Sequence, residues 1–318
     1  TAAAGQIRNN TNETSEASAS CEEYYNGTEW KRLNNVALPI VPSEHFSKVL
    51  YDGTSATQSI TGVGFKPDLV WIKRTDGTEN NYWQDSTRGS TYQMYTNLNS
   101  AQFNETTAVT SFDSDGFTMG SYNGINNSGE SYVAWCWKVN GGNTSSNTDG
   151  DITSTVQVNS KAGFSIVQFQ TNGNSASRVG HGLSQTPDVV LYKQSSQAAN
   201  WWWYTSLFDG SFDYVQFNSD GAIQSSSGAA PDSTTIFAES GSGGQTMNAY
   251  CFHSVDGYSK FGTYQGNASQ DGPLVETGFE PAFLMVKRLS QTANWRVVDN
   301  TRSPFNHRQK ILFPNLTN

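Results

Sequence analysis

The sequence predicts an all-β protein built from tandem β-sandwich domains of the jelly-roll type, preceded by a short N-terminal β-hairpin segment. Three observations lead to this fold class. Aromatic residues make up 13% of the 318 residues, and 29 glycines accompany many Ser, Thr and Asn residues, a composition typical of strands joined by turns. No stretch has helical periodicity of useful length. One short sequence motif also occurs three times.

Each copy of this motif has a glycine, a proline and then an apolar run that ends in lysine. The copies run from Pro67 to Lys73, from Pro187 to Lys193 and from Pro281 to Lys287. Proline fixes φ and cannot donate to a strand ladder, so it marks the start of a strand. A run such as DLVWIK is apolar almost without interruption, which favours a central strand buried on both faces. We expect the final lysine to lie where this strand emerges into water.

The copies are spaced by roughly a hundred residues, which predicts tandem domains rather than the turns of a solenoid. The predicted organisation is a hairpin segment (1–36), a linker (37–45), a first repeat (46–140), a flexible linker rich in Gly, Ser and Asn (141–151), a second repeat (152–254) and a partial third repeat (255–318).

The first two repeats close alike, with YVAWCWK around Cys136 and MNAYCFH around Cys251, and the third has no such string before Asn318. An uncovered sheet edge is an aggregation hazard. We therefore expect a neighbouring copy, another subunit or a further segment to complete the third sheet.

Two charged pairs recur at the same distance after the proline. Asp85 and Arg88 follow Pro67 by 18 and 21 residues, and Asp299 and Arg302 follow Pro281 by the same distances. The second repeat has Thr205 and Phe208 there instead. We interpret the pairs as structural ion pairs that stabilise a turn, each contributing under about 1 kcal/mol if exposed.

Composition excludes several classes of function. The net charge is −9, so the basic surface expected of a nucleic-acid-binding protein is missing. The three cysteines, Cys21, Cys136 and Cys251, are an odd number without a close pair, which predicts reduced thiols rather than disulfides or a thiolate metal site. No apolar run reaches the roughly 18 residues of a membrane span, and residues 1–35 are too polar for a signal peptide. We expect neither nucleic-acid binding nor membrane insertion.

Catalytic and metal-binding signatures are equally hard to find. The histidines His45, His181, His253 and His307 belong to no metal-binding or nucleophile motif. VGHGL around His181 predicts a turn, as do DSDG (113–116) and DGD (149–151), which resemble only fragments of calcium loops. We expect no enzyme activity, no metal and no cofactor, although two carboxylates meeting across a groove, as in a glycosidase, would leave no trace in the sequence.

The string NWWWYTS is the most unusual in the chain. On a strand, Trp201 and Trp203 face one side and Trp202 the other, so one indole is expected to meet solvent if only one face is buried. An exposed indole can stack on a sugar ring, and Asn200 and Tyr204 could hydrogen-bond its hydroxyls. These five residues are the candidate glycan or receptor site; the alternative is that the triplet belongs to the core.

The N-terminal strings GQIRNN (5–10) and EEYYNGTEWKRL (22–33) predict two short strands, the second broken by a turn at Asn26-Gly27. Together they resemble the G-x-I-R-x-N and Glu-x-Tyr-Asn-Gly-x-x-Trp segment of bacteriophage tail-fibre and other virion fibre proteins. The polar insert TNETSEASASC (11–21) departs from that pattern. From Phe46 onward, strings such as SITGVGFKPDLVWIKR, TSFDSDGFTMGS and VDGYSKFGTYQGN resemble an uncharacterised domain of tail and fibre proteins in marine phages.

The resemblance implies a virion structural protein, a tail-fibre or appendage subunit involved in host attachment, and it brings no catalytic residues. It further implies a homotrimer, contacts with other tail or capsid proteins, a glycan or protein receptor on the host surface, and a place on the virion after assembly in the host cytoplasm. Two alternatives stay open: a tailspike glycan depolymerase, and a capsid-decorating or neck fibre with a purely structural role.

Overall fold

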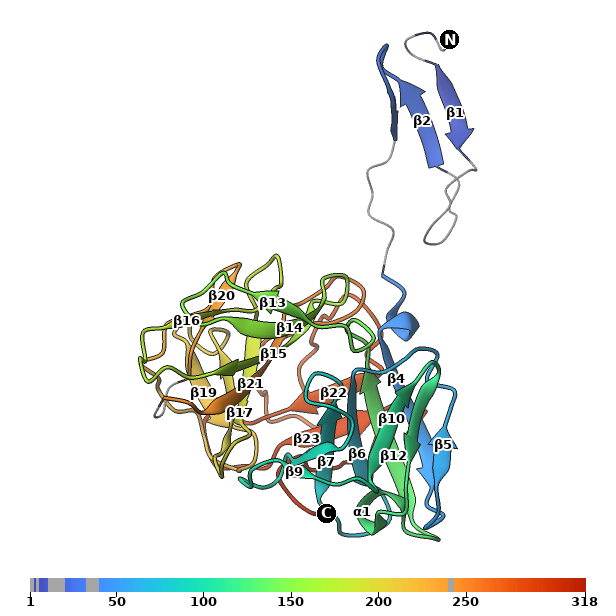
Figure 1. Ribbon diagram of the computed structural model, residues 1–318. Helices are drawn as coiled ribbons and strands as arrows, with labels where there is room; N and C mark the ends of the chain where they lie inside the picture. Colours follow the sequence, from blue (N-terminus) through green and yellow to red (C-terminus); the bar gives the residue numbers. More distant parts are fainter. Residues whose placement is uncertain (1–2, 4–5, 11–20, 33–39, 240–242) are drawn as a thin grey trace. The chain divides into compact units, whose positions relative to one another are not determined.

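The fold is described from a computed structural model, for residue 3 and residues 6–10, 21–32, 40–239 and 243–318. The chain divides into two compact units, Thr1–Pro39 and Ile40–Asn318. Within the described residues, regular helix is confined to α1 (Asn123–Asn126) and to the 3-10 turn η1 (Pro42–Glu44), and strands form the rest of the regular structure (Figure 1). The predicted all-β fold is confirmed.

The first unit is an antiparallel sheet with the strand order β1-β2-β3 (Ile7–Asn10, Cys21–Tyr25 and Trp30–Arg32). The predicted turn at Asn26-Gly27 separates β2 from β3. Gly27 adopts a φ of 100°, and the Asn26 side-chain oxygen accepts the backbone N–H groups of Thr28 and Glu29, each at 2.9 Å. Residues 11–20 of the polar insert and residues 33–39, including the start of the expected linker, lie outside the described residues.

The first repeat in the second unit is a sandwich of two antiparallel sheets. One has the order β4-β12-β6-β7-β8-β9 and the other β10-β11-β5. The bounds are β4 Phe46–Asp52, β5 Gln58–Ile60, β6 Leu69–Arg74, β7 Asn81–Asp85, β8 Tyr92–Tyr95, β9 Phe103–Asn104, β10 Val109–Asp113, β11 Gly116–Met119 and β12 Ser131–Trp137. Phe117, Met119, Val70 and Ile72 belong to the core between the two sheets.

The second repeat has the same plan. Its large sheet has the order β13-β14-β15-β21-β17-β18-β19, and the pair β16-β20 forms a small second sheet. The bounds are β13 Ser145–Asn147, β14 Ser154–Asn159, β15 Phe164–Gln170, β16 Arg178–Gly180, β17 Val189–Gln194, β18 Trp201–Thr205, β19 Asp213–Gln216, β20 Thr235–Phe237 and β21 Thr246–Phe252. The flexible linker predicted for 141–151 is wrong, because β13 pairs with β14 and Gly142 N–H donates to Gln157 at 3.1 Å.

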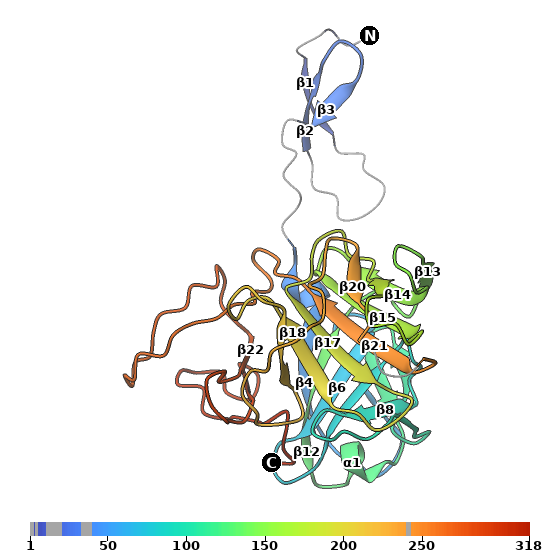
Figure 2. The ribbon, with the colours of Figure 1, turned by 90° about the vertical axis from the view of Figure 1, so that its left-hand side faces the viewer.

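The third repeat is much smaller. Its described strands are β22 (Phe283–Val286) and β23 (Arg296–Asp299), which form an antiparallel pair. The chain between Gly262 and β22 contains turns but no described strand, and it follows one side of the unit as the orange-brown trace in Figure 2. The segment that opens the first two repeats with a strand is therefore coil here.

The three repeats pack against one another around a shared apolar core. In the first repeat Leu69, Trp71 and Trp135 contribute to it; in the second Leu191, Trp201 and Tyr250; in the third Trp295, Val297 and Leu312. Alternate residues of the repeated strand face opposite ways, so Trp71 enters this shared core while Val70 and Ile72 enter the core of their own sandwich. The apolar run is nearly continuous because both faces of β6 and β17 are buried.

Candidate functional site: the ring of three copies and its open face

The lysine that ends each repeated strand joins one copy to the copy before it. Lys193 is fully buried, and its ammonium group donates to the carbonyl oxygens of Ala199 in its own copy at 2.5 Å and of Asn99 in the first copy at 3.1 Å. Lys287 likewise donates to Ala293 at 2.8 Å and to Asp220 of the second copy at 3.1 Å. The expectation that the lysine emerges into water is wrong for Lys193, whereas Lys287 is part-buried; both lysines bond to the copy before their own.

The same contact closes the ring between the first and third copies. Lys73 is fully buried and donates to Glu79 O and, 244 residues away, to Thr317 O, both at 2.5 Å. Burial is the main cause that lowers the pKa of Lys73 to about 8 and that of Lys193 to about 7, and the positive charge of Arg88 adds to the effect at Lys193.

A second contact follows the same cyclic order. The Trp201 indole N–H donates to Tyr95 O of the first copy at 2.8 Å, and the Trp295 indole N–H donates to Gln216 O of the second copy at 3.0 Å. Asn81 takes the equivalent place in the first copy, and its amide donates to the Pro314 and Leu316 carbonyls of the third copy at 2.9 and 2.8 Å. Each copy thus holds the one before it, and the three form a closed ring.

An asparagine before this position fixes the geometry in all three copies. Asn80, Asn200 and Asn294 each stand 13 residues after the repeat's proline. Their side-chain oxygens accept from Asn97, Asn218 and Asn315 at 2.8, 3.0 and 2.8 Å. The common spacing of Asn80, Asn200 and Asn294 is a sequence signal from which this position could have been recognised. Their partners escape such a search because loops of different length precede them.

The expected ion pairs form, but they are not exposed. Asp85 and Arg88 are 2.6 Å apart with fully buried side chains, and Asp299 and Arg302 are also 2.6 Å apart and buried. Each aspartate accepts a further hydrogen bond from a strand of another copy. Asp85 accepts from the Tyr250 hydroxyl of β21 at 2.7 Å, and Asp299 accepts from the Trp135 indole of β12 at 3.3 Å. The pairs therefore join copies as well as turns, and the weak contribution expected of an exposed pair does not apply.

The tryptophan run splits between two environments, as strand alternation predicts. Trp201 is fully buried and, with the part-buried Trp203, faces the shared core, where Trp203 packs against Trp295 at 5.3 Å between ring centroids. Trp202 faces the other way and is part-buried against the core of the second repeat. Tyr204 on the same face is buried, and Asn200 is occupied by Asn218. Trp201 therefore belongs to the core and cannot stack on a ligand, whereas Trp202 and Trp203 are each partly exposed.

A polar cavity lies on the Tyr204 side of this sheet. It has a volume of about 320 Å³ and is lined by Tyr204, Tyr214, Phe237, Glu239 and the serine segment 225–228, with Ser175. Tyr204 and Tyr214 are paired across β18 and β19 with ring centroids 5.0 Å apart. Serine hydroxyls and aromatic rings therefore line the same cavity. Sequence reasoning missed the serine segment because a run of serines is typical of any loop.

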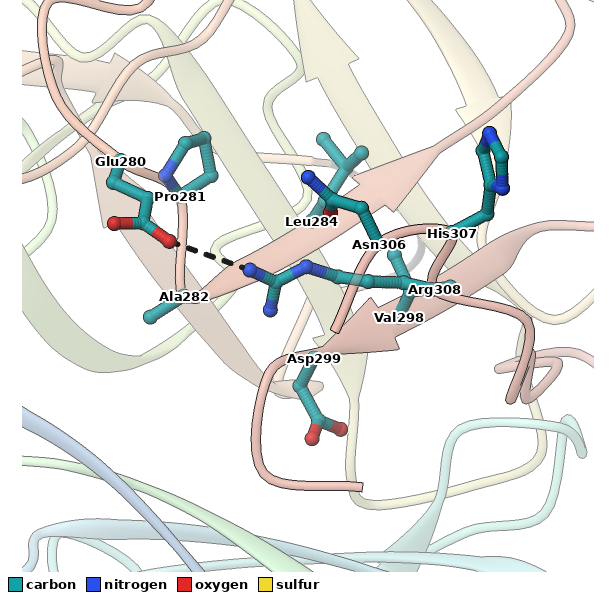
Figure 3. A pocket seen from close by; sticks show the side chains of 9 residues that line it. All are labelled: Glu280, Pro281, Ala282, Leu284, Val298, Asp299, Asn306, His307 and Arg308. Carbon is teal, nitrogen blue, oxygen red and sulfur yellow. Dashed lines mark hydrogen bonds and ion pairs between the residues drawn. The ribbon is translucent and has the colours of Figure 1, made fainter. Parts of the chain in front are cut away.

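A larger cavity, of about 600 Å³, lies on the outer face of the third copy. Figure 3 shows its apolar floor, with Leu284 and Val298, and its rim, where Arg308 reaches Glu280 at 3.5 Å. The side chain of Leu284 is 48% exposed, whereas its equivalents Val70 and Val190 are buried in the sandwich cores. This face is open because the third copy has no second sheet among its described strands.

The remaining motif residues serve the fold. The His181 ring is fully buried and bonded through both nitrogens, accepting Leu183 N–H at 3.1 Å and meeting Asp232 O at 3.2 Å, and burial lowers its pKa. Asp115 of DSDG accepts the N–H groups of Gly62 and Gly64 at 3.0 and 2.6 Å. Cys136 and Cys251 are buried free thiols, and burial raises the pKa of Cys251 to about 12.

No group of three or more potential metal ligands occurs among the described residues, and no described helix is long and apolar enough to cross a membrane.

Comparison with known proteins identifies one family. Residues 41–318 match the family described as Domain of unknown function (DUF7483). No curated protein and no solved structure matches this chain. The match covers all three repeats of the ring and most of the chain, so the protein belongs to the DUF7483 family.

Proposed function

We propose that the protein is a structural subunit of a bacteriophage virion appendage, a tail fibre or a similar structure, that contacts the host surface. The observation that carries the structural role is the use of the buried charges. Lys73, Lys193 and both Asp–Arg pairs are buried and make contacts within and between copies. In a catalytic site such charged groups would instead face a cleft that the substrate can enter.

The virion assignment is supported by the sequence. The fibre-type segment of residues 5–33 precedes the ring, and the repeats resemble a domain of phage tail and fibre proteins. Within this segment the β2–β3 hairpin turns at Asn26-Gly27. Assembly into a homotrimer and contacts with other tail or capsid proteins are part of the proposal and rest on the same resemblance.

The host contact is proposed for the second copy. Trp202 is the part-buried indole that faces away from the shared core, and the serine-lined cavity with Tyr204 and Tyr214 lies on the same side of the sheet. A neutral sugar matches these groups, because its C–H face can stack on an aromatic ring while its hydroxyls bond to serine hydroxyls.

Labelling of whole virions tests the proposal. Antibodies raised against residues 40–318 should decorate a tail appendage in negative-stain electron microscopy, and the purified chain should bind host cells without releasing reducing ends or unsaturated sugars from host polysaccharide. Decoration of the capsid alone would contradict the attachment role. Release of sugar fragments would contradict the non-enzymatic role and favour the depolymerase.

A further inference from the structure

Among the described strands, the third copy has no equivalent of β12 in the first copy and β21 in the second. In the first, β6 lies between β7 and β12, and in the second, β17 lies between β18 and β21. The equivalent strand β22 pairs with β23 on one edge and with no described strand on the other. β12 and β21 are each paired on both edges, to β4 and β6 and to β15 and β17, so neither is free to fill the gap.

Exposed apolar residues are concentrated in the third copy. Six of the ten large hydrophobic residues that are exposed in the described chain belong to the third copy: Tyr264, Leu274, Val275, Leu284, Phe305 and Ile311. An open strand edge that carries an exposed apolar residue, as β22 does at Leu284, is typical of a site that a further strand covers. Phe283 and Met285 are already packed against the shared core, so the inner face of β22 is in place for such a strand.

We propose that the open edge of β22 binds an extended peptide segment. This segment is a strand of about seven residues, the length of β12 and β21, that pairs antiparallel with β22 and has apolar residues on both faces. The first two copies show the register. Trp135 lies opposite Trp71, and Tyr250 lies opposite Leu191. In the partner strand, the residue equivalent to Trp135 and Tyr250 is the central one. It lies opposite Met285 and enters the shared core.

The ring order identifies what this central residue meets. Tyr250 of the second copy donates to Asp85 of the first, and Trp135 of the first donates to Asp299 of the third. By the same order, a strand on the third copy meets the second copy at Thr205 and Phe208, where the ion pair is replaced. The Thr205 hydroxyl already donates to Asp188 O at 2.6 Å and accepts Leu207 N–H at 3.1 Å.

The central residue of the partner strand is therefore an apolar one without a donor, such as phenylalanine. A tryptophan or tyrosine there would face, in place of a carboxylate, the Thr205 hydroxyl, which already donates once and accepts once and therefore offers a single lone pair, a weaker acceptor. The far end of the strand is less constrained than in the complete copies. In the complete copies, Asp68 and Asp188 accept the backbone N–H groups of Val139 and Ser254, which lie two residues beyond β12 and β21. The third copy has Ala282 in place of this aspartate, so it offers no such acceptor.

Peptide binding to the chain of residues 1–318 tests the proposal. The probe is a labelled peptide of residues 131–138 with phenylalanine at positions 135 and 137, alanine at 136 and two added lysines at each end for solubility. We expect saturable binding by fluorescence anisotropy and slowed hydrogen exchange in residues 283–286. The same peptide with tryptophan at position 135 should bind roughly tenfold more weakly, because its indole N–H meets a weaker acceptor.

Two variants of the chain sharpen the test. Thr205→Asp with Phe208→Arg restores the ion pair, so the preference should reverse and the tryptophan peptide should bind more tightly. Leu284→Glu alters a half-exposed side chain on β22, so it should leave the melting temperature unchanged. It should abolish binding, because it places a charge beside the apolar peptide strand. This variant tests the proposal even if the double variant fails to fold. Equal binding of a scrambled peptide, no change in exchange at 283–286, or self-association of the chain through this edge would each overturn the proposal.

Discussion

The hydroxyl of Tyr250 in the second copy donates to Asp85 Oδ2 in the first copy at 2.7 Å, across 165 residues of sequence. Asp85 also holds Arg88 at 2.6 Å, and neither side chain of the pair meets solvent. Burial, followed by the charge of Asp85, raises the pKa of Tyr250 well above its ordinary value, so this tyrosine is a donor at neutral pH. A turn of the first copy and a central strand of the second are thus joined through one carboxylate.

Replacing Asp85 is expected to destabilise the ring strongly. Asp85→Asn leaves the Arg88 charge buried without its partner, which typically costs about 3–5 kcal/mol of unfolding free energy. Glu280→Gln is the matched control, because this carboxylate is 85% exposed in its pair with Arg308 and its loss should change stability by less than about 0.5 kcal/mol. Urea denaturation of both variants measures the difference, and equal midpoints would show that the buried pair has no special role.

Stability should rise with pH above neutrality. The pKa of Lys193 is about 7 in the folded chain, well below the ordinary value of 10.5 that applies to the unfolded chain. Between these values the unfolded state binds a proton that the folded state does not, so the free energy of unfolding increases with pH by up to about 1.4 kcal/mol per unit. Lys73, with a pKa of about 8, adds to this above pH 8.

The Lys193→Met variant isolates this contribution. Its stability should depend less steeply on pH between 7 and 10 than that of the unaltered chain, while Lys310→Met, at an exposed position, should leave the slope unchanged. Chemical denaturation at several pH values gives the slopes. If the slope of Lys193→Met equals that of the unaltered chain, Lys193 is not the group that titrates.

The tryptophan run should separate stability from binding. Trp201→Ala removes a fully buried indole and its bond to Tyr95 O, so it should lower stability by about 3–5 kcal/mol. Trp202→Ala should fold and melt closer to the unaltered chain, and it should weaken binding to host cells by about 1–3 kcal/mol, the contribution of one aromatic contact. Thermal melts and cell-binding assays on both variants distinguish these outcomes. Unchanged binding by folded Trp202→Ala would remove the sugar platform.

The turn of DSDG should tolerate no side chain at its glycine. Gly116 has a φ of 149°, and a Cβ there would lie 1.9 Å from the carbonyl oxygen of Ile60. Gly116→Ala should therefore lower stability by more than about 1 kcal/mol. Gly262→Ala, where a Cβ would meet nothing within 4 Å, should stay within about 0.5 kcal/mol. A thermal melt of Gly116→Ala that matches that of Gly262→Ala would contradict this account of the turn.

The local parts of the fold could be predicted from the sequence. Pro67 to Lys73 and Pro187 to Lys193 show the strand and its burial directly, because an uninterrupted apolar run has no polar face to expose. The alternation of Trp201, Trp202 and Trp203 between two cores also follows from the period of two.

The ring itself could not be predicted in this way. Its contacts join residues far apart in the chain, such as Lys73 with Thr317, and they use backbone carbonyls, which carry no sequence signal. A lysine after an apolar run is usually exposed, so only the packing of three copies reveals why it is buried here. The spacing of the two Asp–Arg pairs predicts these ion pairs, but their partners Tyr250 and Trp135 lie in other copies.

Native-state hydrogen exchange on the full chain, read by mass spectrometry, tests most directly whether the three copies form one structural unit. We predict that amides of β6, β17 and β21 exchange through a common opening, and that Asp85→Asn, a change in the first copy, lowers protection in β17 and β21 of the second copy by the same free energy as in β6. Loss of protection confined to the first copy, with β17 and β21 opening independently, would contradict the closed ring.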